Sequence, residues 1–270
     1  MSNPTVTDTY AWIKPLARGG YAARGVVYLI VGFFTLLAAV GAGQKQGTRG
    51  ALRTVLEQPF GQALLWIIVV GLVGYVIWRL IQAIFDTDQH GLGPKGLAVR
   101  GGLLSSAGTY ALLTLFALSA MGVVAPGGEA GPSFADRIAR IVGSQWVSLG
   151  LALIFTGVAG AHYWKAFKRK YADHFQANEQ QMRFIHPISQ FGLVARGTIF
   201  TIIALLLAFR FMDRQESGDA APPGLTDALT FLQQLPYGGL LLAAMGLGLM
   251  AFATYSLIEA RWRRINVEDA

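Results

Sequence analysis

The chain has 270 residues, of which 53% are hydrophobic and 14% are charged, and its formal net charge is +7. A soluble domain carries about 25% charged residues, so this composition excludes an ordinary soluble fold. The sequence contains no cysteine, which excludes disulfides, thiolate nucleophiles and cysteine metal sites. The first apolar run is too long for a signal-peptide core, so we expect it to be retained as a membrane span.

Six apolar runs are long enough to cross a bilayer, which needs about 20 consecutive apolar residues. Backbone polar groups have no water to bond in hydrocarbon, and the alternation typical of barrel strands is missing, so the runs are predicted to be helices. The sequence therefore predicts an all-α polytopic membrane protein. The predicted spans are residues 21–42, 62–84, 99–124, 144–167, 190–211 and 237–260.

Lysine and arginine are unevenly divided between the two sets of loops. The N-terminal segment, the loops around 79–100 and 165–196, and the C-terminal tail hold roughly twice as many as the other three loops. By the positive-inside rule, the richer side faces the cytoplasm. We therefore expect a multi-pass protein with both termini in the cytoplasm.

The spans are predicted to be three tandem copies of one two-helix unit. An Arg-Gly pair lies near the start of each odd-numbered span, at 24–25, 100–101 and 196–197. Pro-aromatic-Gly precedes the second and sixth spans, at 59–61 and 236–238, whereas the middle copy has lost it. Copies with the same orientation predict a pseudo-threefold bundle about an axis along the membrane normal. The predicted units are 15–90, 91–175 and 176–265, between a cytoplasmic N-terminal segment 1–14 and a cytoplasmic tail 266–270.

Small residues recur at two matching positions of each even-numbered span. We expect them to face neighbouring helices, because small residues permit close backbone approach in membranes. These residues are Gly71, Gly74, Gly157, Gly160, Gly248 and Ala251.

A short amphipathic stretch precedes each even-numbered span. Its apolar residues are spaced by three, which suits a helical face: Leu52 and Val55, Ile138 and Ile141, Leu229 and Leu232. We predict three short helices near the outer interface, with Thr48, Ser133 and Thr226 as candidate N-caps. An ordinary helical loop turn is the alternative.

Three segments carry a resemblance to a known family. Arg-Gly-Gly-Tyr-Ala-Ala-Arg-Gly-Val-Val-Tyr at 18–28, Glu-Gln-Pro-Phe-Gly at 57–61 and Arg-Trp-Arg-Arg-Ile at 261–265 resemble a bacterial membrane family catalogued as a domain of unknown function, number twelve-oh-six. The resemblance covers about residues 15 to 265. It implies three repeats of paired spans in a bacterial inner membrane, and it implies no activity. The middle copy departs from the pattern, which argues against exact threefold symmetry.

Arg24, Arg100 and Arg196 are the matching arginines of the three units, and we expect them at similar depth near the cytoplasmic face. In a pseudo-threefold bundle they would converge into a ring. Three planar guanidinium groups would suit a phosphate or a carboxylate, including a lipid headgroup. The alternative is that each arginine reaches to the lipid headgroups at its own helix end and fixes topology.

His162 is the candidate polar residue within a span, and ionisable groups at membrane depth are functional candidates by default. It has no visible carboxylate partner, so a packed neutral histidine is favoured. Gln82, Lys168 and Glu259 match one another at the ends of the even-numbered spans, where solvated helix ends are favoured over a polar network. The other histidines lack metal-ligand spacing, and no metal or cofactor is predicted.

Basic residues gather at the cytoplasmic ends of the fourth and sixth spans, where we expect them to contact anionic lipid. They are Lys165, Lys168, Arg169, Lys170, Arg261, Arg263 and Arg264. This basic surface is too small for nucleic acid.

No nucleotide-binding or nucleophile-elbow motif is present, and no carboxylates pair at mid-membrane. The predicted function is therefore non-enzymatic: binding of lipid, of a membrane protein partner, or of a second copy of the chain. The alternative is a channel or transporter for a small solute along the pseudo-threefold axis, where the three arginines would favour anions. A lipid-modifying enzyme with His162 as base is a weaker third hypothesis.

Overall fold

A computed structural model describes residues 13–42, 46–124, 144–212 and 222–265, and the description below is confined to them. These residues form helices joined by short connections, and their only β-type pairing is a single bridge between Phe175 and Arg263. Six of the helices are long and apolar enough to cross a membrane. The long helices are α2 (Ile13–Ala39), α4 (Gly61–Phe85), α5 (Pro94–Ala120), α7 (Ser144–Phe167), α8 (Glu179–Met212) and α10 (Gly238–Trp262). The short ones are α3 (Thr48–Leu56), η1 (Ala172–His174) and α9 (Leu225–Gln234).

The structure confirms the predicted all-α membrane architecture, but some helices start at other residues than predicted. The even-numbered spans begin and end within a few residues of the predicted limits, whereas α2, α5 and α8 all begin earlier. At α8 the cause is a reciprocal cap: Asn178 Oδ1 accepts from the Gln181 N–H at 2.8 Å, and Gln181 Oε1 accepts from the Asn178 N–H at 3.1 Å. Such a capping box starts a helix in polar sequence, so hydropathy alone places the start too late.

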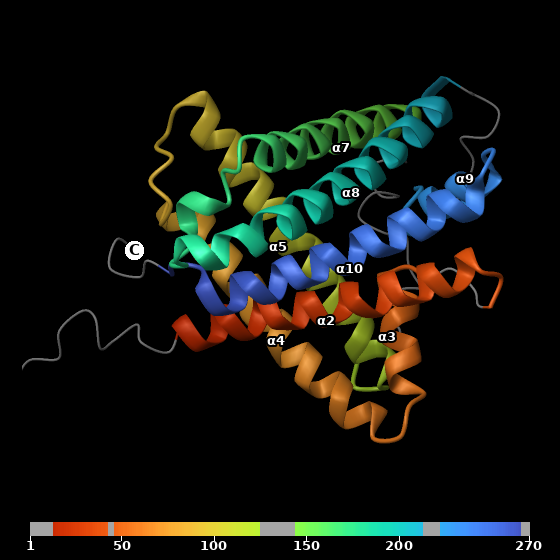
Figure 1. Ribbon diagram of the computed structural model, residues 1–270, viewed down its shortest axis with the longest axis horizontal. Helices are drawn as coiled ribbons and strands as arrows, with labels where there is room; N and C mark the ends of the chain where they lie inside the picture. The colour runs from red at the N-terminus through yellow and green to blue at the C-terminus, as the bar shows by residue number, and fades with distance from the viewer. Residues whose placement is uncertain (1–12, 43–45, 125–143, 213–221, 266–270) are drawn as a thin grey trace, which may run out of the picture.

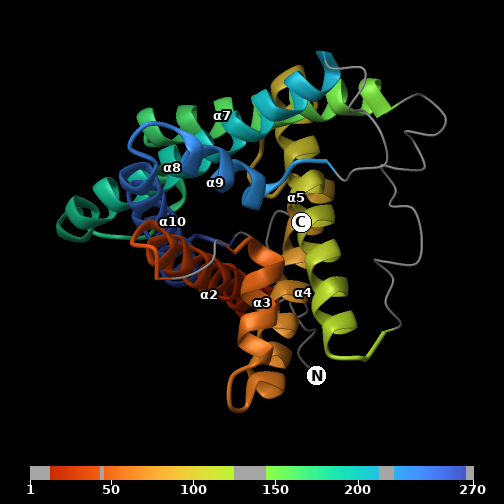
Figure 2. The same cartoon turned by 90° about the vertical axis from the view of Figure 1, so that its right-hand side faces the viewer.

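The long helices pack in chain order around the bundle (Figure 1, Figure 2). Helix α2 packs on α4, α4 on α5, α7 on α8, and α8 on α10, and α10 returns to α2. Among the described residues, α5 and α7 do not form a packed pair of this kind. The threefold arrangement, the three-copy repeat and the unit boundaries therefore stay predictions.

The α2–α4 and α8–α10 crossings are built from residues at the same positions. A methyl group added to Gly20 would lie 2.6 Å from the Tyr75 Cα, and one added to Gly192 would lie 2.6 Å from the Phe252 Cα. Both close approaches need a residue without a side chain. The two hairpins thus cross in the same manner at these sites.

The aromatic residues of the two Pro-aromatic-Gly elements also share one conformation. Phe60 has φ 61° and Tyr237 has φ 62°, each just before an even-numbered span. This left-handed backbone is uncommon outside glycine. It reverses the chain between a short helix and the long helix that follows.

The short helices α3 and α9 use the predicted apolar faces. Leu52 and Val55 are buried on α3, and Leu229 and Leu232 are buried on α9. The third predicted short helix, with Ser133, Ile138 and Ile141, lies outside the described residues.

The predicted N-caps of these helices are wrong. Thr48 is the first residue of α3, and the cap is Gly47. Thr226 lies inside α9, where the Gly224 N–H donates to the Asp227 carboxylate at 2.8 Å. A carboxylate in the first turn satisfies a free backbone donor as well as a hydroxyl cap would.

Candidate functional site

Polar side chains gather at the end of the bundle where α2 begins and α10 ends, which we call the basic end. In Figure 1 the last turn of α10 lies at this end, and α9 lies near the opposite one. The six largest fully buried side chains of the described chain are aromatic, among them Trp78, Tyr21, Tyr75 and Tyr255. Charged groups packed among them are removed from both water and lipid.

Arg24 on α2 lies at the centre of this group, with its side chain 3% exposed. Its Nη1 donates to Tyr75 Oη over 2.6 Å, its Nε donates to Ser256 Oγ over 3.0 Å, and its Nη2 donates to the Glu259 carboxylate. The guanidinium also lies over three aromatic rings, at 5.1–5.2 Å from their centroids. Arg24 therefore joins α2 to α4 and to α10.

Glu259 on α10 is 1% exposed and faces three basic side chains. Besides Arg24, its Oε1 accepts from Arg263 Nη1 at 2.8 Å and lies 3.9 Å from Lys165 Nζ on α7. A buried carboxylate without such partners would cost several kcal/mol. This carboxylate is thus the shared counter-ion of three helices.

Helix α4 and the connection after it complete the arrangement. Tyr75 Oη also accepts from Arg79 Nε at 2.8 Å, and Arg79 Nη1 donates to Gln82 Oε1 at 3.1 Å. Gln82 Nε2 donates to Asp88 Oδ2 at 3.0 Å, and the same oxygen accepts from Arg263 Nη2 at 3.2 Å. Hydrogen bonds therefore run in a closed loop from α2 through α4 to α10 and back.

We call this set of side chains the ionic clamp. Its members are Arg24, Tyr75, Arg79, Gln82, Asp88, Lys165, Ser256, Glu259 and Arg263. Basic members outnumber acidic members, so the clamp retains positive charge.

The structure corrects the favoured interpretation of Gln82 and Glu259. Both were expected at solvated helix ends, yet each is 1% exposed and belongs to the clamp. Lys168, the third member of that set, is exposed, and Lys165 one turn earlier contacts Glu259 instead. The buried aromatic rings around this end displace the water that the sequence pattern led us to expect.

Sequence reasoning also missed most of the other clamp members, although a signal was present. Arg79, Lys165 and Ser256 lie three residues before the matching set 82, 168 and 259. Residues three apart share a helix face. A polar position repeated on the same face one turn apart is a sign of a network, not of a solvated end.

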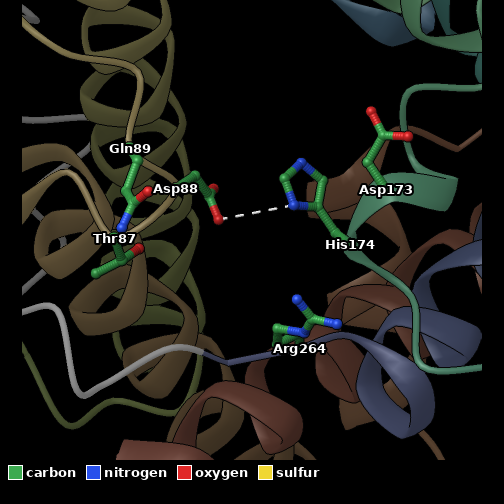
Figure 3. A pocket seen from close by; sticks show the side chains of 6 residues that line it. All are labelled: Thr87, Asp88, Gln89, Asp173, His174 and Arg264. Atoms are coloured by element: carbon green, nitrogen blue, oxygen red, sulfur yellow. Dashed lines mark ion pairs between the residues drawn. The ribbon is translucent and has the colours of Figure 1, made fainter.

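A polar pocket of about 120 Å³ adjoins the clamp at the basic end. Its lining comes from the α4–α5 connection and from the segments around η1 and the end of α10 (Figure 3). His174 Nδ1 lies 3.9 Å from Asp88 Oδ1 across it. Burial lowers the pKa of His174, and the positive charge of Arg263 lowers it further. Hydrogen bonds from the backbone N–H of His90 and of Gly91 lower the pKa of Asp86 at the start of the connection.

The structure does not assemble the predicted ring of three arginines. Arg24 is bound within the clamp. Arg100 donates to the carbonyl oxygens of Ala83 and Ile84, both at 2.6 Å, and so caps the end of α4. Arg196 lies over aromatic rings, the nearest being Phe252 at 4.5 Å from its centroid. The free carbonyls at the end of α4 hold Arg100 at that helix end, whereas Arg24 and Arg196 both lie over the Phe252 ring.

The predicted helix-packing residues of the first and third predicted units lie at helix crossings. A methyl group added to Gly71 would lie 2.6 Å from Ala23 Cβ, and one added to Gly74 would lie 2.7 Å from the Leu16 oxygen. Gly248 approaches Ala195, and the Ala251 backbone lies at the Gly192 crossing.

Gly157 and Gly160 on α7 depart from the expectation, because no atom of another element lies within 4 Å of an added methyl group. Helix α7 packs on α8 through a different face. Small residues therefore mark a helix crossing in the first and third units and not on α7.

Most of the predicted lipid-contacting residues are exposed at the basic end. The exposed ones are Lys168, Arg169, Lys170, Arg261 and Arg264. Lys165 and Arg263 belong to the clamp instead. Lys168 lies over the exposed Trp164 ring at 5.5 Å, and Arg261 lies over Trp262 at 6.0 Å.

His162 lies in α7 with its Nδ1 2.8 Å from the Val158 carbonyl oxygen, and its ring meets Phe200 edge-on at 5.2 Å between centroids. No ion pair involves it in the described part of the chain. Within that part, no group of three acidic or histidine side chains could hold a metal ion. The site as a whole is thus a buried ionic clamp that joins helices, with an open polar pocket beside it.

Comparison with known proteins gives a family without an assigned activity. The family described as Domain of Unknown Function (DUF1206) matches residues 19–86 and 191–263, which lie within the first and third predicted units. A protein of Bacillus subtilis (strain 168) described as "Uncharacterized protein YxxB" is 30% identical over 97% of this chain and 95% of its own length. No solved structure matches the chain. On the extent of both matches, the chain belongs to the DUF1206 family.

Proposed function

We propose that this protein is a non-enzymatic integral membrane protein that binds anionic lipid at its basic end. The ionic clamp holds the helices together at this end, and the exposed lysines and arginines there contact the lipid headgroups. We place it in a bacterial inner membrane with both chain ends in the cytoplasm, because the excess of lysine and arginine lies at this end.

The observation that carries the proposal is the division of the basic residues into two classes. Clamp members have acidic or hydroxyl partners inside the bundle, as Arg24 has with Glu259. Lys168, Arg169 and Arg264 are exposed and have no ion-pair partner in the described structure. Exposed cations beside tryptophan are typical of a membrane interface, and each adds about 1 kcal/mol of attraction to anionic lipid.

The clamp favours a closed bundle at this end, and it argues against a conduit there. The guanidinium of Arg24 is surrounded by the rings of Tyr21, Tyr75 and Phe252. Side chains that fill the centre of a bundle favour a scaffold, whereas a conduit needs a lined opening.

Retained lipid tests the proposal. The full chain is placed in nanodiscs with equal amounts of phosphatidylglycerol and phosphatidylcholine, released, and examined by native mass spectrometry. We expect phosphatidylglycerol to be retained preferentially. Replacing Lys168, Arg169, Lys170, Arg261 and Arg264 together by glutamine should remove that preference.

Arg49→Gln with Arg53→Gln is the matched control, since these exposed arginines lie on α3, which precedes the start of α4. The control should keep the preference for phosphatidylglycerol. Equal retention of the two lipids by the unaltered protein, or an unchanged preference in the five-residue variant, would overturn the proposal.

A conduit for a small anion is the second candidate, favoured by one observation. Arg196 lies near the middle of α8, and no acidic side chain pairs with it in the described structure. The test is flux of chloride and phosphate into liposomes that contain the protein. Flux that Arg196→Gln abolishes would replace the scaffold hypothesis, and its absence would leave the lipid-binding proposal in place.

A further inference from the structure

Arg196 on α8 occupies the same kind of position as Arg24 on α2. Arg24 lies over the Tyr75 ring of its own hairpin at 5.1 Å, and Arg196 lies over the Phe252 ring of its own hairpin at 4.5 Å. Tyr75 and Phe252 also match in the two helix crossings described above. The two guanidinium groups are therefore held by equivalent frameworks.

The acceptors that bind Arg24 are absent around Arg196. The Tyr75 hydroxyl has no equivalent, because Phe252 stands at that position. Helix α7 packs on α8 as α10 packs on α2, and Lys165 and Lys168 stand at the positions of the α10 acceptors in the repeat alignment. Two acceptor positions are thus basic and one is apolar.

The structure leaves the Arg196 guanidinium without a counter-ion among the described residues. Its Nε is buried and has no hydrogen-bond partner. Two more aromatic rings surround it, Tyr28 at 4.9 Å and Phe200 at 5.2 Å from their centroids. Cation–π contacts stabilise a guanidinium, yet they accept none of its N–H groups in a strong hydrogen bond.

We propose that Arg196 binds an oxyanion, the carboxylate or phosphate group of a lipid or of a free solute. A cation without a counter-ion is expensive within a membrane, and an oxyanion supplies the missing charge and acceptors. The site shares no residue with the lipid surface at the basic end and does not depend on it.

Thermal unfolding of the full chain in phosphatidylcholine nanodiscs tests the proposal with two probes. One arm adds inorganic phosphate, and the other incorporates phosphatidylglycerol. We expect at least one probe to raise the Tm, because a ligand that binds only the folded state stabilises it. A rise with phosphate assigns the site to a free anion, and a rise with phosphatidylglycerol alone assigns it to a lipid.

Variants separate this site from the rest of the molecule. Arg196→Gln should abolish the rise. Arg100→Gln, at the matching arginine of the middle unit, should leave it unchanged, since Arg100 caps α4. Arg196→Gln should also keep its lipid preference at the basic end in mass spectrometry, so the two proposals fail separately.

The unliganded Tm distinguishes a binding role from a structural one. If the guanidinium lacks a counter-ion in the unliganded protein, Arg196→Gln without probe should unfold at the same temperature as the unaltered protein or at a higher one. A large fall in Tm without probe would mean that the aromatic rings satisfy Arg196 by themselves. That fall, an equal rise in Arg196→Gln and the unaltered protein, or no rise with either probe would overturn the proposal.

Discussion

The seam between α2 and α10 and the edge formed by α5 and α7 are made from similar sequence and behave differently. At the seam, Gly32 and Gly246 face each other so closely that a methyl group on either would lie within 3.0 Å of the other's carbonyl oxygen. On α7, Gly150, Gly157 and Gly160 meet no atom of another element within 4 Å. The same small residue closes one interface and leaves the other open.

The difference lies in what accompanies the glycines. The seam ends in the clamp, where Arg24 and Glu259 join the two helices. Lipid is as apolar as leucine, so helices in a membrane associate through packing and polar contacts. Glycine permits approach, and the buried ion pair specifies which helix approaches. Helix α7 contributes only Lys165 to the clamp, and it does so from a distance of 3.9 Å.

The largest effect should follow from removing the shared counter-ion of the seam. Glu259→Gln leaves Arg24 buried without a carboxylate, and it leaves Arg263 with Asp88 alone. Breaking a buried ion pair by removing one partner costs about 3–5 kcal/mol. We expect a large fall in Tm, and a loss of folded protein in detergent measured by size-exclusion chromatography.

Lys168→Gln is the control, because Lys168 stands at the matching position of α7 and is exposed. Surface substitutions usually change stability by less than about 0.5 kcal/mol. If both variants unfold at the temperature of the unaltered protein, the clamp does not hold the seam.

A smaller loss should follow from removing one hydroxyl. Tyr75 Oη accepts hydrogen bonds from Arg24 at 2.6 Å and from Arg79 at 2.5–2.8 Å. Hydrogen bonds to charged groups contribute about 1.5–3 kcal/mol, and Tyr75→Phe leaves two buried guanidinium groups with fewer acceptors. Tyr163→Phe is the matched variant, since its hydroxyl meets only Thr198 and Thr201, both at 3.2 Å. A Tm loss in Tyr163→Phe as large as in Tyr75→Phe would contradict the special role of the clamp.

Glycine substitutions test the packing half of the comparison. Gly71→Ala would place a methyl group 2.6 Å from Ala23 Cβ, and such overpacking costs about 1–3 kcal/mol. Gly157→Ala meets open space, so we expect no loss of stability, since alanine favours helix over glycine. Chemical denaturation in detergent measures both. Equal losses would show that α7 has a partner through this face.

More of the fold than of the site could be predicted from the sequence. Apolar run length determines where a helix can cross, so the long helices were located from hydropathy. The start of α8 was missed because Asn178 and Gln181 begin the helix in polar sequence.

Pairing across the bundle is the part that a single sequence does not specify. Arg24 and Glu259 are 235 positions apart, and their contact depends on α10 packing beside α2. The predicted repeat places three arginines at matching positions, yet their neighbours differ. Arg24 meets a carboxylate and Arg100 meets carbonyl oxygens. Equivalent positions thus acquired different environments that only the helix order reveals.

The smallest expected effect concerns pH at the pocket beside the seam, where the segment after α7 meets the end of α10. The Arg264 N–H donates to the His174 carbonyl oxygen at 2.8 Å, so this segment is tied to α10. Burial, followed by the charge of Arg263, lowers the pKa of the His174 imidazole, while Asp88 opposes the change. The folded state therefore disfavours the protonated imidazole.

The direction of the pH effect follows from that shift. Above about pH 6.5, the ordinary pKa of histidine, the imidazole is neutral in both states and has no effect on stability. As the pH falls below that value, the unfolded chain takes up the proton more readily, so the free energy of unfolding decreases until the lower pKa of the folded state is passed. We expect the Tm to fall between pH 7.5 and 5.5, and to fall less in His174→Gln. Identical slopes of Tm against pH in the two proteins would contradict this prediction. They would mean that the pKa of His174 is the same in the folded protein as in the unfolded chain, and that protonation in the α7–α8 connection does not affect the stability of the seam.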